Sequence, residues 1–152
     1  MKLVIEIDPD SPEEIRIRAK RSDERLQRLR EVLDRELSGP GEIVLKKGEA
    51  ECFVSPAEIL FAETAGEKVW VHTAGEVYLW PGRLWELERL LPRGFARAGK
   101  GCLVNTLCIS SIARSPTGVG EASFFSGEKK AFISRMYYKI VRDVIEEVRL
   151  KK

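Results

Sequence analysis

The chain has 152 residues, of which 43% are hydrophobic and 33% charged, with a formal net charge of +2. This composition is typical of a soluble globular protein with one domain, or one domain and a small appendage. The longest apolar runs are far shorter than the roughly 20 residues needed to cross a bilayer, which excludes a membrane-spanning protein. Because the first eight residues show no signal-peptide pattern, we expect a cytoplasmic protein.

Three cysteines and a single histidine limit the chemistry. Cys52, Cys102 and Cys108 show no C-x-x-C spacing, which favours free buried thiols over a disulfide or metal site. His72 lies in the alternating segment 69–73, which predicts a sheet-face histidine with a structural hydrogen bond. With no second histidine and no nucleophile signature, we expect no enzyme, no cofactor, no metal and no small-molecule substrate.

Residues 1–40 predict a small β-β-α module. Leu3–Ile7 is strand-like, Asp8–Pro12 is a turn signal, and Ile15–Ala19 alternates apolar and basic residues as a half-buried strand does. A helix follows, with Ser22 as the expected N-cap. Its apolar stripe comprises Leu26, Leu29, Val32, Leu33 and Leu37. Gly39-Pro40-Gly41 is the expected hinge to the remainder, and we expect the module to serve assembly or signal input.

Residues 41–152 predict a mostly antiparallel β domain with flanking helices, so the fold class is α+β. Glycine-containing turns separate short strands at 43–46, 51–54, 60–64, 69–73, 77–80, 95–98, 103–104, 109–114, 122–125 and 131–133. A short amphipathic helix is expected at 83–91, ending at Pro92. Ser134 is expected to cap a final helix with one apolar stripe.

The charge is distributed unevenly along the chain. Residues 1–92 hold 14 Lys and Arg against 19 Asp and Glu, whereas residues 93–152 hold 12 against 5. The C-terminal part therefore has a balance of +7, which indicates an anionic partner. Solvated basic faces are also common, so the charge by itself leaves nucleic acid open as one of two readings.

The run Gly94-x-x-x-x-Gly99-Lys100 matches seven of the eight positions of a phosphate-binding loop. The eighth position should carry the hydroxyl that holds magnesium, and here it is Gly101. Residues 95–98 also alternate as a strand does, and no helix pattern begins at Lys100. We therefore interpret the match as accidental and expect another role for Lys100.

Three separated blocks of the sequence resemble the LytTR DNA-binding domain family, over roughly residues 42–149. The first is the strand pair in EILFAETAGEKVWVHT, the second is LWELERLLPRGFARAGKGCLVNTLCISSI, and the third is AFISRMYYKIVRDVI. The matching residues are Glu63, Thr73, Leu84, Leu87, Glu88, Leu91, Pro92, Phe95, Arg97, Val104, Asn105, Ser134 and Arg135.

The resemblance implies a transcription regulator that places loops into successive major grooves of double-stranded DNA. The base-contacting positions of the family correspond to Lys68, Lys100 and Arg135, and lysine and arginine donate well to guanine O6 and N7. Lys129 and Lys130 are candidates for phosphate contacts, together with Gly99 and Gly101 beside the DNA backbone. Family members commonly carry His and Ser where this chain has those two glycines.

The resemblance also implies partners. We expect a homodimer on DNA, and short family members without a receiver domain are often restrained by a membrane protein. Residues 1–40 lack a receiver domain, so phosphorylation of an aspartate in this chain is not the expected switch.

Two alternatives remain open. One is an RNA- or single-strand-binding β module in which Trp70, Trp80 and Trp85 stack bases, although aromatic residues spaced through strands and a helix are more often core. The other is a protein-interaction module whose basic face meets an acidic protein.

Overall fold

The computed structural model describes residues 2–12, 14–38 and 41–150, and its backbone contacts divide the chain into two units, residues 1–37 and 38–152. Gly39 and Pro40 of the expected hinge lie outside the described residues. Within the described ranges, no helix combines the length and the apolar content that crossing a bilayer requires.

The first unit consists of one helix, α1 (Glu24–Ser38), and an irregular segment before it. The strands predicted at Leu3–Ile7 and Ile15–Ala19 are absent from its described residues, so the β-β-α prediction is wrong in this respect. An isolated two-stranded hairpin is marginal in water. Here the second segment instead lines a groove along α1, while Leu3 and Ile7 remain 87% and 91% exposed.

The helix cap also differs from the prediction. Asp23, not Ser22, caps α1, because the Asp23 carboxylate accepts a 2.8 Å hydrogen bond from the Leu26 amide. A carboxylate at this position satisfies a free amide and favours the helix dipole. Ser22 accepts a hydrogen bond from the Gln27 side chain instead. Leu26, Leu29 and Leu33 are half-buried as the stripe predicted, but Val32 is 52% exposed, contrary to the prediction. The side chain of Leu37 lies outside the described part.

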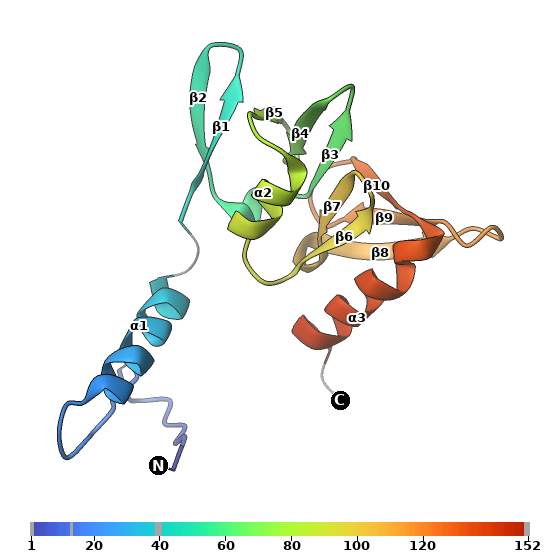
Figure 1. Ribbon diagram of the computed structural model, residues 1–152. Coiled ribbons are helices and arrows are strands. Elements are labelled where there is room, and N and C mark those ends of the chain that lie inside the picture. The colour runs from blue at the N-terminus through green and yellow to red at the C-terminus, as the bar shows by residue number, and fades with distance from the viewer. Residues whose placement is uncertain (1, 13, 39–40, 151–152) are drawn as a thin grey trace. The chain divides into compact units, whose positions relative to one another are not determined.

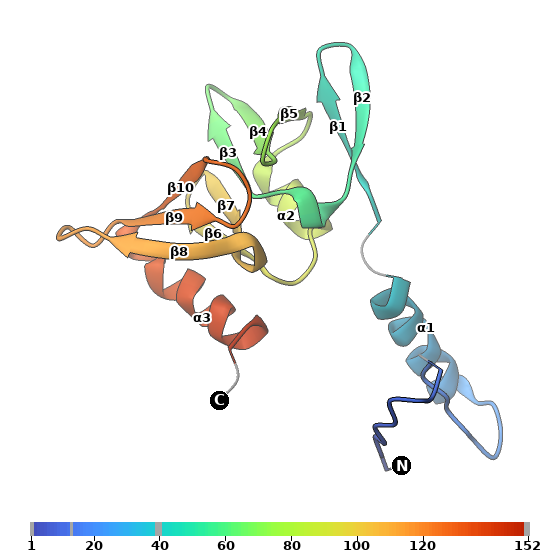
Figure 2. The same cartoon turned by 180° about the vertical axis from the view of Figure 1, so that it is seen from behind.

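The second unit contains a seven-stranded antiparallel sheet with the strand order β2-β1-β5-β4-β3-β7-β6 (Figure 1). Its strands are β1 (Ile43–Lys47), β2 (Ala50–Val54), β3 (Phe61–Ala65), β4 (Lys68–His72), β5 (Val77–Trp80), β6 (Phe95–Gly99) and β7 (Cys102–Asn105). A three-stranded antiparallel sheet of order β10-β9-β8 accompanies it (Figure 2). Its strands are β8 (Ile109–Arg114), β9 (Gly120–Phe124) and β10 (Lys130–Ile133). The predicted mostly antiparallel α+β fold is confirmed.

Two helices and three single turns of 3-10 helix complete this unit. The helices are α2 (Leu84–Leu90) and α3 (Tyr138–Val148), and the 3-10 turns are η1 (Pro56–Glu58), η2 (Thr106–Cys108) and η3 (Arg135–Tyr137). The prediction that Ser134 caps the last helix is wrong. The chain first forms η3, and the Ser134 side chain makes no capping hydrogen bond.

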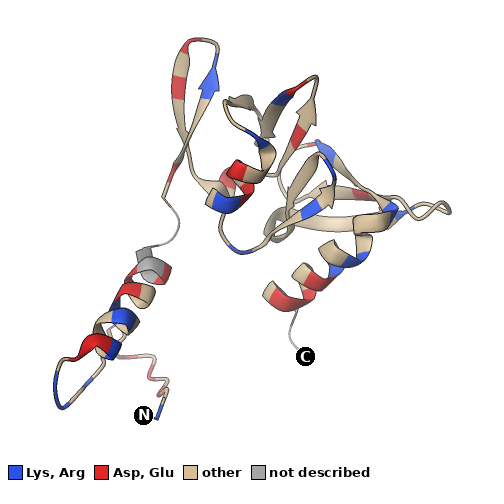
Figure 3. Cartoon of the chain, in the orientation of Figure 1, with Lys and Arg blue, Asp and Glu red and all other residues tan. Residues whose placement is uncertain are grey.

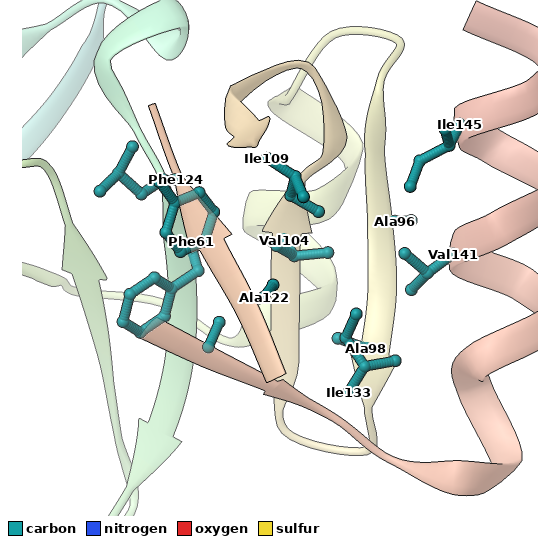
Figure 4. Packing of buried hydrophobic residues seen from close by; sticks show 12 residues of the cluster. Phe61, Ala96, Ala98, Val104, Ile109, Ala122, Phe124, Ile133, Val141 and Ile145 are labelled. Carbon is teal, nitrogen blue, oxygen red and sulfur yellow. The ribbon is translucent and has the colours of Figure 1, made fainter. Parts of the chain in front are cut away.

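Each face of the seven-stranded sheet has its own hydrophobic cluster, because alternate side chains of a strand point to opposite faces. On one face, Leu84 and Leu87 of α2 pack with Ala62, Val71 and Leu103. On the other face, a cluster joins β3, β6 and β7 to the three-stranded sheet and α3. Figure 4 shows Val141 and Ile145 of α3 pointing toward Ala96 and Ala98 of β6. The helices and the small sheet therefore hold β6 and β7 from both sides.

Asn105, which ends β7, is 2% exposed and joins two of the 3-10 turns. Its side-chain nitrogen donates to the Ile59 carbonyl at 2.9 Å, and its oxygen accepts from the Leu107 amide at 3.1 Å. A buried amide side chain needs such partners to offset its lost hydration. Asn105 is therefore a structural residue.

Candidate nucleic-acid interface

Lys68 stands at the end of a tight hairpin. It is the first residue of β4 and pairs with Ala65 of β3 across a two-residue turn. Both turn residues, Gly66 and Glu67, have positive φ, at 56° and 63°. Such a turn matches the twist of the flanking strands, so the hairpin end is well defined. The exposed Lys68 side chain leaves the sheet at this end.

Lys100 lies in the turn between β6 and β7, where Gly99 pairs with Cys102 and leaves Lys100 and Gly101 as the turn. Strand β7, and not a helix, follows this turn, which agrees with the interpretation of the phosphate-loop match as accidental. The turn rests on β3, because the Thr64 amide donates to the Gly101 carbonyl at 2.7 Å. A Cβ on Gly101 would lie 3.3 Å from the Thr64 Cβ, which is a tight contact, so a larger residue here requires Thr64 or the turn to shift.

Arg135 opens η3 and is exposed. The residue before it, Ser134, donates its amide to the Ala98 carbonyl of β6 at 2.7 Å. The Arg135 side chain runs along the turn between β8 and β9, since a Cβ on Gly118 would lie 2.9 Å from its Cγ and Cδ. This arginine therefore lies between the end of β6 and the end of the small sheet.

These contacts place the three elements in one row. Strand β3 links the Lys68 turn to the Lys100 turn through the bond between Thr64 and Gly101, and β6 links the Lys100 turn to Arg135 through Ala98. All three lie at the end of the seven-stranded sheet where β3 and β6 finish and β4 and β7 begin. The structure therefore brings together Lys68, Lys100 and Arg135, the three residues that are expected to contact bases.

Lys129 and Lys130 are positioned differently. Lys129 is half-buried, and its ammonium donates to the Glu76 carbonyl at 2.7 Å, beside the turn between β4 and β5. That turn is at the opposite end of the sheet from Lys68. Burial lowers the pKa of Lys129 from its usual value, and the Glu76 carboxylate opposes this effect. Lys130 is exposed and pairs with Glu121 of β9 at 2.8 Å.

Arg114 is a further cation near Arg135 that was not predicted from the sequence. Arg114 ends β8, stacks its guanidinium 4.1 Å from the Tyr138 ring centroid and donates to the Gly118 carbonyl at 3.4 Å. Like Lys68, it is a basic residue at a strand end beside a glycine-containing turn, and that signal could have identified it.

The charges of α3 run against its helix dipole. Lys139 and Arg142 lie in its first half, whereas Asp143, Glu146 and Glu147 lie in its second half, as the blue and red segments of Figure 3 show. A helix by itself favours the reverse order, with carboxylates at its start and cations at its end. An anionic partner near the start of α3 would offset this cost.

His72 has the structural role that its strand position predicted. Its Nε2 lies 3.0 Å from the Glu63 carboxylate, and its ring stacks on Phe61 with centroids 4.3 Å apart. Burial of the ring lowers the pKa of His72, although the Glu63 carboxylate opposes the shift. Cys52, Cys102 and Cys108 are free thiols, and burial raises the pKa of Cys102 to about 11. In the described part of the chain no group of three potential ligands could hold a metal ion.

Comparison with known proteins gives a match to one family model and matches to solved structures. The family model of the LytTr DNA-binding domain matches residues 49–146. A solved LytTr DNA-binding domain, from a protein described as a methyl-accepting/DNA response regulator of Bacillus cereus, superposes with a TM-score of 0.64. The two sequences are 22% identical, and the match covers 70% of this chain and 98% of that one. No curated protein matches the chain.

Proposed function

Because this chain belongs to the LytTR DNA-binding domain family, we propose that it is a sequence-specific transcription regulator whose loops enter successive major grooves of double-stranded DNA. In this proposal Lys68, Lys100 and Arg135 donate hydrogen bonds to base edges, most favourably to guanine O6 and N7. Lys130 contacts a phosphate, which can replace its pair with Glu121 at little cost because both side chains are exposed to water. The small Gly99 and Gly101 let the main chain approach the DNA backbone.

The observation that carries the proposal is the row of three basic positions at one end of the sheet. The Thr64–Gly101 and Ala98–Ser134 hydrogen bonds hold this row by main-chain atoms, each at 2.7 Å. A row anchored on strand ends keeps the spacing of its side chains, and fixed spacing is what recognition of separated base pairs requires. The cations at the start of α3 support an anion at the same end.

Lys129 is left out of the proposed phosphate contacts. Its ammonium already bonds the Glu76 carbonyl beside the turn at the opposite end of the sheet. A phosphate contact would have to break this bond, so the supported role of Lys129 is to join the turn before β10 to the turn before β5.

The single-strand alternative receives less support from the tryptophans. Trp70 pairs with Glu63 on the face that carries His72, whereas Trp80 packs with the cluster under α2 on the other face. Trp85 is 51% exposed on α2 itself. Base stacking along a strand requires aromatic rings in succession on one surface. These three residues do not provide such a surface.

The test is binding to duplexes selected from a random pool, with RNA and an acidic protein as competitors. If about five phosphates are neutralised, log affinity should fall with log salt at a slope of roughly −4 to −5. Duplex DNA should outcompete RNA. A nearly flat slope, or equal competition by the acidic protein, would leave the basic surface without a DNA role.

The first unit supports a second element of the proposal, a homodimer formed through residues 1–40. Val4, Ile5 and Ile15 are 65%, 77% and 60% exposed although they are apolar. Residues 1–38 carry 9 Lys and Arg against 10 Asp and Glu, a balance of −1, so two copies would not repel each other. A second copy can supply the apolar cover that these residues lack, and two linked copies suit a site with two halves.

A further inference from the structure

Strand β6 is irregular just before the Lys100 turn. Its register with β7 shifts between Arg97, which pairs with Leu103, and Gly99, which pairs with Cys102. Ala98 is thus the extra residue of a β-bulge. Bulges bend a strand and redirect the side chains beside them.

Arg97, beside this bulge, makes two side-chain contacts. Its Nη1 donates to the Lys100 carbonyl at 2.6 Å, and its Nε donates to the Glu88 carboxylate at 2.7 Å. The guanidinium is planar with donors at fixed angles, so one group can orient two acceptors together. The Arg97 and Glu88 side chains are 26% and 41% exposed, so water screens this pair only in part.

Glu88 is itself held in place. It lies in α2, which is anchored by Leu84 and Leu87, 7% and 0% exposed. A continuous path therefore runs from the packed helix through Glu88 and Arg97 to the main chain of Lys100. The Lys100 turn is fixed on one side by Thr64, through the Gly101 carbonyl, and on the other by Arg97, through the Lys100 carbonyl.

We propose that Arg97, oriented by Glu88, is a positioning residue that sets the direction in which Lys100 reaches its base pair. A lysine has many rotamers, and ordering it at a base costs conformational entropy. Because the Lys100 carbonyl is held in place, the main chain of Lys100 is fixed and so is the direction in which its side chain leaves it. Less conformational entropy is then lost on binding. This inference rests on the proposed function, because it assigns to Arg97 the control of one of the proposed base contacts.

A direct phosphate contact by Arg97 is the competing role, and it has a different signature. Removing a phosphate contact weakens binding to all sequences alike, whereas a positioning residue affects discrimination at one base pair. Arg97→Lys separates the two, because it keeps the positive charge but cannot bond both acceptors in the guanidinium geometry. Glu88→Gln is the second variant, since it weakens the hold on Arg97 and leaves Arg97 and Lys100 in place.

Arg93→Lys is the matched control. Arg93 also pairs with a carboxylate, that of Glu147 at 2.5 Å, and it precedes β6 at the strand end away from the Lys100 turn. The probe is the duplex that the unmodified full chain selects from a random pool. It is compared with its variant at the one base pair where Lys100→Ala loses discrimination, and thermal midpoints are recorded for every variant.

We expect Arg97→Lys to reduce discrimination at this base pair by about fivefold, because Lys100 would keep its base contact but lose part of its fixed direction. Glu88→Gln should act in the same direction with a smaller effect, and Arg93→Lys should change nothing. In a Lys100→Ala background, Arg97→Lys should cause no further loss at this base pair, because coupled residues are not additive. Affinity for unrelated duplexes should stay unchanged.

The inference is overturned if Arg97→Lys leaves discrimination intact, lowers affinity for all duplexes alike, or adds its full loss to that of Lys100→Ala. If Arg97→Lys fails to fold, the same measurements of discrimination at the Lys100 base pair are made with Glu88→Gln, and their result decides. Should the unmodified chain select no preferred duplex, the proposed function itself fails and the inference fails with it.

Discussion

The amide of Ser134 donates to the carbonyl of Ala98 at 2.7 Å and so ties the segment before Arg135 to the bulged edge of β6. Ala98 is 1% exposed, so its carbonyl depends on this partner. The φ of Ser134 is −59°, which a proline adopts without strain. Proline at position 134 would therefore remove this hydrogen bond, because it has no amide hydrogen, while it keeps the backbone conformation of Ser134.

The first prediction concerns this bond. Ser134→Pro should destabilise the fold by about 1–3 kcal/mol, because it leaves a buried carbonyl unpaired. It should also reduce DNA discrimination by displacing Arg135. Ser134→Ala is the control, since it retains the amide. Urea denaturation measures the loss of stability, and binding to the selected duplex measures the loss of discrimination. Equal results for Ser134→Pro and Ser134→Ala would show that this hydrogen bond does not position Arg135.

A second prediction separates the two glycines of the Lys100 turn. Gly101→Val should push the turn off β3, because even a Cβ there lies 3.3 Å from the Thr64 Cβ. Overpacking of this kind costs about 1–3 kcal/mol of stability, and specific DNA affinity should fall with it. At Gly99 an added Cβ meets Cys102 and Ser134 at 3.9 and 4.0 Å, which is ordinary contact. Gly99→Ala should therefore be nearly neutral in thermal denaturation, and a larger loss there than at Gly101 would contradict the packing described.

A third prediction follows from His72. Burial lowers its pKa from the ordinary 6.5, and Lys129 lowers it further while Glu63 opposes. Its buried Nδ1 has no hydrogen-bond partner among the described residues, so a proton there would be unpaired. The unfolded chain binds a proton near pH 6.5 and the folded chain does not, so stability is complete above that pH and falls as the pH drops below it.

His72→Gln should remove the part of the loss of stability at low pH that comes from His72. Urea midpoints measured at about pH 7.5 and about pH 5.5 should therefore differ less for His72→Gln than for the unmodified chain, since only the histidine titrates between them in its usual range. An identical change in both proteins would mean that another group carries the pH dependence.

A fourth prediction tests the proposed dimer. A shortened protein that starts at Gly41 should fold, because both clusters around the seven-stranded sheet lie in residues 43–145. It should sediment as a monomer and bind one half of the selected site, with loss of cooperative binding to the whole site. A shortened protein that dimerises like the full chain would exclude residues 1–40 as the interface.

Local patterns predicted the second unit well. Strand bounds from the sequence agree with the structure within two residues, from Ile43–Lys47 to Lys130–Ile133, because alternation and turn residues are properties of adjacent positions. The same reasoning failed at Leu3–Ile7 and Ile15–Ala19. Alternation gives a segment one apolar face but does not supply a neighbouring strand, and here none is present in the described residues.

The residues of the candidate site remain a prediction from the family pattern, and the contacts that hold them in place could not be predicted from the sequence. Lys68, Lys100 and Arg135 came from the family pattern, yet the bulge at Ala98 and the contacts of Arg97 depend on segments far apart in sequence. The bond from Lys129 to the Glu76 carbonyl, which removes it from the proposed contacts, likewise joins two distant turns. Sequence spacing carries no signal for such long-range contacts.

The most direct measurement is selection of binding sites from random duplex DNA by the full chain and by Lys68→Ala, Lys100→Ala and Arg135→Ala. The three residues come from separate turns in one row, so each substitution should relax a different base-pair position, by about 1–3 kcal/mol, and leave the others selected. Uniform weakening across all positions would reduce these residues to phosphate contacts. Unchanged selection by all three variants would contradict the assignment of this end of the sheet to base recognition.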